Sequence, residues 1–145
     1  MRLGIGTLAL SGKYQNIKAD KVRATLNNIN SDKIEFIDWA SCYQENGLNV
    51  LEEISRVESL NSKELIFKFG RDEKRDDYKI KKELEKINEI NWHGDITLMF
   101  HRPLVTNYEK DLNNLENYKN FVFSKKIRFG ISGDNFLHIE NYLNN

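Results

Sequence analysis

The fold is predicted from the stretch Leu65-Ile66-Phe67-Lys68-Phe69-Gly70. It is an apolar run of the length of a strand that contains one lysine and ends at a glycine. Four other short apolar runs share this character and recur roughly every 30 residues, at 3–10, 34–38, 96–100 and 127–132. The runs are continuous rather than alternating, which is typical of parallel strands buried on both faces.

Amphipathic segments fill the sequence between these runs. In residues 19–29, for example, Val22, Leu26 and Ile29 share one helical face. The helices predicted in this way span 19–29, 48–60, 76–90, 108–121 and 135–143. A strand–helix series of this kind predicts an α/β fold with right-handed crossovers. We find no linker or low-complexity tract, so residues 1–145 are predicted to form a single domain of about five parallel βα units.

Two parallel architectures fit such a series. A doubly wound sheet carries a glycine-rich phosphate loop after its first strand, but Gly4-Ile5-Gly6-Thr7 has no matching third glycine and no helix directly after it. A (β/α)8 barrel places its chemistry at the carboxyl ends of several strands. Asp38, Lys68, His101 and Ser132 stand at such ends, so a partial barrel is the favoured prediction and a doubly wound nucleotide binder the weaker one.

The composition excludes several function classes. The formal net charge is zero, so no global attraction to nucleic acid or anionic lipid is expected. No apolar run approaches the roughly 20 residues of a membrane span, and no signal peptide is evident. Cys42 is the single cysteine, which excludes an internal disulfide and favours a reducing cytoplasm.

Five motifs follow one another in an order that matches a known family. They are Leu3-Gly4-Ile5-Gly6-Thr7, Phe36-Ile37-Asp38-Trp39-Ala40-Ser41-Cys42-Tyr43, Lys68-Phe69-Gly70, His101-Arg102-Pro103 and Lys126-Ile127-Arg128-Phe129-Gly130-Ile131-Ser132. Each motif is weak alone. Together, over nearly the whole chain, they resemble the aldo-keto reductases, whose fold is the (β/α)8 barrel.

The resemblance implies a site for hydride transfer from NADPH, or from NADH, to an aldehyde, ketone or sugar-like carbonyl. Tyr43 would donate the proton, and the Lys68 ammonium, held charged by Asp38, would stabilise the phenolate. His101 would orient the substrate carbonyl. The cofactor-binding residues implied by the resemblance are Gly6, Thr7, Asp38 and Ser132.

The chain also departs from the family pattern. Trp39 replaces the usual threonine, Gly133 stands where asparagine is expected, and Gln44 replaces a common glycine. A complete barrel takes about 250 residues, whereas this chain of 145 residues has five units. The implied barrel is therefore incomplete and truncated before the last three strands. In the family these strands supply the ring that stacks on the nicotinamide and most of the contacts to the cofactor phosphates.

Three consequences of an incomplete barrel are left open. The chain is a truncated product that keeps the motifs without function, a partial barrel completed by self-association or by a partner chain, or a catalytically inactive, open α/β interaction module. An open barrel face also predicts a large exposed apolar patch. Purely structural interpretations apply as well. A Lys68–Asp38 salt bridge would stabilise the fold as readily as it would serve catalysis, and Cys42 would be inert packing. The charges of residues 81–86 would form a solvated helix face.

Overall fold

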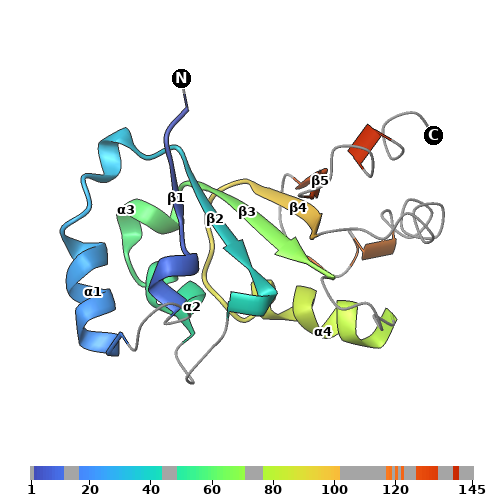
Figure 1. The fold of residues 1–145 in the computed structure, drawn as a ribbon, viewed down its shortest axis with the longest axis horizontal. Helices are drawn as coiled ribbons and strands as arrows, with labels where there is room; N and C mark the ends of the chain where they lie inside the picture. Colours follow the sequence, from blue (N-terminus) through green and yellow to red (C-terminus); the bar gives the residue numbers. More distant parts are fainter. Residues whose placement is uncertain are drawn as a thin grey trace.

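The computed structural model describes residues 2–11, 17–43, 49–70, 77–101, 117–118, 120, 122, 127–133 and 139–140. Five strands form one sheet in the order β1-β2-β3-β4-β5 (Figure 1). They are β1 Gly4–Gly6, β2 Phe36–Ala40, β3 Glu64–Phe69, β4 Ile96–His101 and β5 Ile127–Ser132, and all four pairings are parallel. This confirms the predicted α/β fold with a parallel sheet. Among the described strands the order has no reversal, so this part of the sheet does not show the switch point of a doubly wound fold.

The described helices are α1 Ala19–Asn27, α2 Val50–Ser55, α3 Glu58–Asn61 and α4 Asp77–Asn88, together with 3₁₀ turns at Leu8–Ser11, Ser31–Lys33 and Ser41–Tyr43. The single helix predicted over residues 48–60 is wrong. Val57 is extended (φ −93°, ψ 101°) and caps α3, so the chain breaks between α2 and α3. The helices predicted over 108–121 and 135–143 fall largely outside the described residues.

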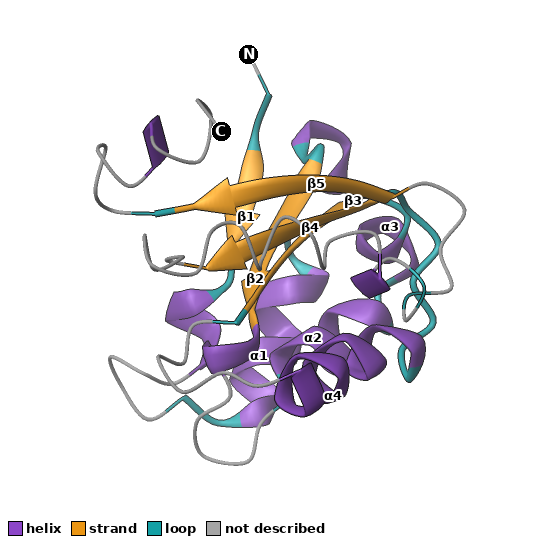
Figure 2. Ribbon diagram, turned by 90° about the vertical axis from the view of Figure 1, so that its right-hand side faces the viewer, coloured by secondary structure: helices purple, strands orange, loops and turns teal. Residues whose placement is uncertain are grey.

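The two faces of the sheet differ. Helices α1, α2 and α4 lie on one side of it (Figure 2). On β3, Leu65, Phe67 and Phe69 are fully buried, whereas the alternate residues are half-buried. The buried set packs with Val22, Leu26, Leu51, Ile54, Leu84 and Leu98 into the core between sheet and helices. The alternation places Glu64 and Lys68 together on the opposite face, at the two ends of β3.

Apolar side chains on this opposite face are only half-buried, among them Phe36, Ile66 and Met99. A Cβ atom at Gly4 would lie 2.1 Å from the Phe36 ring, so the glycine makes room for this ring. Within the described ranges, the large apolar side chains that are exposed are Leu3 and Tyr78. The apolar side chains of this face are therefore individually part-exposed, and the predicted apolar patch stays a prediction.

Candidate active site

Four predicted site residues lie toward the carboxyl edge of the sheet. The prediction that Asp38 ends its strand is wrong: β2 continues to Ala40, so Asp38 is its middle residue. Tyr43 ends the 3₁₀ turn that follows this strand. Lys68 is the penultimate residue of β3, and His101 is the last residue of β4. Parallel pairing brings the carboxyl ends of strands to one edge, so residues separated by about 30 positions in sequence become neighbours.

Lys68 connects two of the other residues. Its Nζ lies 2.7 Å from Asp38 Oδ1 and 5.6 Å from the centroid of the Tyr43 ring. The Lys68 side chain is 12% exposed and that of Asp38 28%, so the ion pair is partly shielded from water. An ammonium in this position is held by the carboxylate and interacts with the π face of the phenol ring.

The pKa of Lys68 is raised above its ordinary value. Burial acts to lower it, but the hydrogen bond and the charge of Asp38, followed by the contribution of Tyr43, outweigh burial. The ammonium therefore stays protonated throughout the neutral range and provides a fixed positive charge beside the phenol.

His101 and Tyr43 are both buried, each with 8% exposure. Their rings meet edge to face, with centroids 6.4 Å apart and planes at 88°. Cys42 Sγ lies 3.7 Å from His101 Nδ1, a contact that the interpretation of Cys42 as inert packing did not anticipate. Cys42 directly precedes Tyr43 in the same turn, so its sequence position could have indicated that it lies beside the candidate site.

The predicted cofactor-binding residues lie on β1, directly after it, on β2 and on β5, which stands at the other end of the strand order. Gly6 pairs with Asp38, and a Cβ atom at Gly6 would meet nothing within 4 Å. Ser132 ends β5 and pairs with His101. Thr7 is fully buried, and its hydroxyl donates to the Asp38 carbonyl oxygen at 2.8 Å. Its side chain thus fastens the end of β1 to β2.

Two further residues near the site are Trp39 and Glu83, and the prediction for Glu83 is wrong. Trp39 is fully buried on the helix side, with its ring centroid 4.8 Å from that of Phe67, and so points away from Asp38 and Lys68. Glu83 does not belong to a solvated face, because it bonds to Ser41 and Gly70. Its spacing of three from Ile80 and four from Ile87, both buried, is the signal that sequence reasoning missed.

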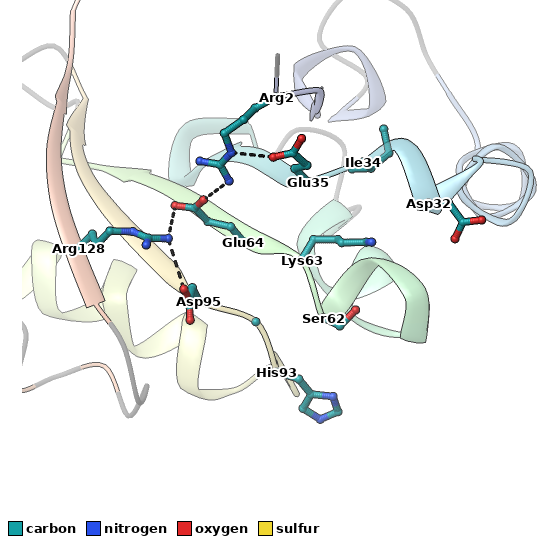
Figure 3. Close-up of a pocket in the computed structure, with 11 residues that line it drawn as sticks. Arg2, Asp32, Ile34, Glu35, Ser62, Lys63, Glu64, His93, Asp95 and Arg128 are labelled. Atoms are coloured by element: carbon teal, nitrogen blue, oxygen red, sulfur yellow. Dashed lines mark hydrogen bonds and ion pairs between the residues drawn. The ribbon is translucent and has the colours of Figure 1, made fainter.

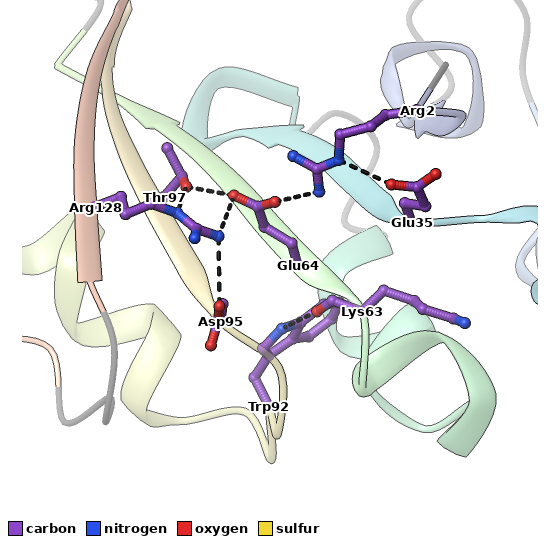
Figure 4. Close-up of polar contacts among 8 residues, drawn as sticks. All are labelled: Arg2, Glu35, Lys63, Glu64, Trp92, Asp95, Thr97 and Arg128. Carbon is purple, nitrogen blue, oxygen red and sulfur yellow. Dashed lines mark hydrogen bonds and ion pairs between the residues drawn. The ribbon is translucent and has the colours of Figure 1, made fainter.

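A second group of polar side chains lies at the opposite, amino end of the strands, about 13 Å from Lys68 by strand geometry. Glu64 accepts hydrogen bonds from Arg2 Nη2 at 2.6 Å and from Thr97 Oγ1 at 2.6 Å, and it pairs with Arg128 at 2.8 Å (Figure 4). Arg2 also binds Glu35 at 2.9 Å, and Arg128 reaches Asp95 at 3.4 Å. We call this the strand-start cluster: Arg2, Glu35, Glu64, Asp95, Thr97 and Arg128.

An open pocket of about 700 Å³ adjoins the strand-start cluster (Figure 3). Ser62, Lys63 and His93 line its other side. The strand-start cluster joins segments that begin all five strands, because its members precede or open β1 to β5. Its carboxylates and cations are largely paired with one another, which indicates a role in holding the sheet together.

We predict that the stability of the protein falls in acid because of Glu64. Burial acts to raise the pKa of Glu64, but hydrogen bonds from Thr97, Arg2 and Arg128 lower it to about 2 from 4.5. Because the folded-state pKa is depressed, this stabilisation is present above about pH 4.5 and is lost as the pH falls toward 2. Because the partner arginines are half exposed, the expected fall in the free energy of unfolding is about 2 kcal/mol. Urea unfolding at several pH values checks this, with Glu64→Gln expected to flatten that part of the profile.

Comparisons with protein-family models, with curated proteins and with solved structures each gave no match. No helix in the described part of the chain is long and apolar enough to cross a membrane.

Proposed function

We propose that the protein is an aldo-keto reductase-like oxidoreductase that reduces an aldehyde, ketone or sugar-like carbonyl with NADPH or NADH. The observation that carries this proposal is the convergence of Tyr43, Lys68, Asp38 and His101, which join the phenol, ammonium, carboxylate and imidazole groups that carbonyl reduction uses. The sequential parallel sheet, with Glu64 and Lys68 on the face opposite the helices, supports an arc of a (β/α)8 barrel.

Each side chain has a role in this proposal. The Tyr43 hydroxyl donates a proton to the substrate oxygen, and the Lys68 ammonium stabilises the phenolate that remains. Asp38 keeps Lys68 oriented and charged. His101 contacts Cys42 through Nδ1, and in the proposal its Nε2 donates a hydrogen bond to the same carbonyl oxygen.

In the proposal, a nicotinamide lies at this edge of the sheet. A bound nicotinamide would supply the hydride. Open space in front of Gly6, beside Asp38, suits a flat ring. The resemblance assigns the carboxamide to Ser132 on β5, at the other end of the strand order, so this contact requires the sheet to curve as it does in a barrel. Thr7 would act indirectly, since its hydroxyl donates to the backbone of Asp38. The single cysteine, Cys42, fits a reducing compartment such as the cytoplasm.

The sheet also favours association with another chain. β1 and β5 end the strand order, so within the described residues each has one pairing neighbour, and unpaired strand edges are sites of association. We propose that self-association or a partner chain covers these edges and completes the barrel. Without such a partner, the chain would instead serve as an inactive interaction module.

Cofactor binding and turnover test the proposed function. Titration should change NADPH fluorescence saturably, and a panel of aldehydes and ketones should consume NADPH. Lys68→Met should lower turnover by about tenfold or more, because the phenolate loses its counter-charge. Lys63→Met, at the opposite end of the sheet, serves as the matched control and should leave turnover unchanged. Absence of NADPH and NADH binding at millimolar concentration would overturn the reductase proposal in favour of the inactive module.

A further inference from the structure

Glu83 lies on α4, outside the four proposed catalytic residues, yet it touches the segments that carry two of them. Its Oε2 accepts a hydrogen bond from Ser41 Oγ at 2.9 Å and another from the Gly70 backbone N–H at 2.8 Å. Both bonds are partly buried. One carboxylate oxygen thus joins the turn after β2 to the residue after β3.

The two donors are close in sequence to the reacting groups. Ser41 opens the 3₁₀ turn that ends at Tyr43, and Gly70 follows Lys68 by two residues. Gly70 adopts φ 71°, a conformation that other residues rarely take, and β3 ends at the residue before it. A bond to the Gly70 N–H therefore fixes where β3 stops, and a bond to Ser41 fixes where the turn bearing Tyr43 starts.

We propose that Glu83 is a positioning residue that sets the distance and angle between the Tyr43 phenol and the Lys68 ammonium. This inference rests on the proposed reductase function. Hydrogen bonds to an ionised carboxylate are roughly twice as strong as neutral ones, and here both converge on one atom. Tyr43 and Lys68 stand on separate strand units, and the bridge from α4 constrains one relative to the other.

Removing the carboxylate should loosen this arrangement without unfolding the sheet. Glu83→Ala leaves the Ser41 hydroxyl and the Gly70 N–H without this acceptor, so the turn can shift. A displacement of about 1 Å at a reacting group can cost on the order of a hundredfold in rate. We expect Glu83→Ala to lower kcat by about ten- to a hundredfold while the KM for NADPH stays within about twofold. Glu83→Gln keeps an acceptor oxygen and should restore most of kcat.

Nuclear magnetic resonance separates this inference from the proposed function. The Gly70 amide proton and the ring signals of selectively labelled Tyr43 should shift in Glu83→Ala and return toward wild type in Glu83→Gln. Glu85→Ala is the matched control on the same helix, because Glu85 pairs with Lys82 at the surface, at 2.8 Å. It should leave these signals and kcat unchanged.

The outcomes are distinct. If the wild-type protein binds no cofactor but the Tyr43 and Gly70 signals respond as expected, the proposed function fails while the positioning of Tyr43 by Glu83 stands. If Glu83→Ala leaves those signals unmoved, or if Glu85→Ala moves them equally, the role assigned to Glu83 is overturned. A parallel rise in the KM for NADPH, equal to the fall in kcat, would also overturn it, because the variant would then have damaged the binding surface in general.

Discussion

Tyr43→Phe is expected to lower the rate of carbonyl reduction by about 100- to 10,000-fold, the range in which a positioned proton donor contributes. The substitution removes one oxygen atom and little else. A phenylalanine ring keeps the edge contact with His101 and the interaction with the Lys68 ammonium, so the surroundings of the site should persist. Affinity for NADPH should therefore remain within about twofold, whereas kcat collapses.

Steady-state kinetics and a fluorescence titration of the same preparation measure these two quantities. Tyr78→Phe is the matched control, since Tyr78 lies on α4 and is 69% exposed, and it should change neither. Tyr43→Phe with undiminished kcat would exclude the phenol as the proton donor. A fall in NADPH affinity as large as the fall in kcat would instead make Tyr43 a structural residue of the binding surface.

The strands could be predicted well from sequence because their signal is local. β5 has the predicted bounds, 127–132, and β3 and β4 differ from the predicted runs by one residue. The first strand is shorter than predicted, because the chain turns into a 3₁₀ helix at Leu8. The break between α2 and α3 was missed because Leu51, Ile54 and Val57 keep helical spacing, and only the extended backbone of Val57 reveals the turn.

The candidate site was predictable for a different reason. Polar residues within buried parallel strands need partners, so Asp38 and Lys68 could be expected to pair, and their ion pair is present. Glu83 could not be assigned so readily, because a charged helix residue usually faces water. The strand-start cluster escaped prediction altogether. Its charged members stand one per βα unit, at residues 2, 35, 64, 95 and 128, and only the parallel register brings them together.

Glu64→Ala should lower the free energy of unfolding by about 2 kcal/mol at neutral pH, mainly through the charges it leaves without their partner. The Glu64 side chain is 9% exposed, and it pairs with two arginines and Thr97. Arg2 and Arg128 are about half exposed, so water partly compensates them, and the cost falls below that of breaking a fully buried pair. Urea unfolding measured by far-ultraviolet circular dichroism gives the value.

Glu35→Ala supplies the comparison, because Glu35 binds the same arginine from a position that is 48% exposed. A surface ion pair of this kind contributes at most about 1 kcal/mol. The cost of Glu64→Gln at neutral pH should also match the stability that the wild-type protein loses in acid, since both remove the same carboxylate charge. Equal effects of Glu35→Ala and Glu64→Ala would mean that the buried carboxylate does not hold the five strand starts together. The sheet would then depend on its apolar core alone. In that case the stability of the Glu64→Gln variant should depend on acidic pH in the same way as that of the wild-type protein.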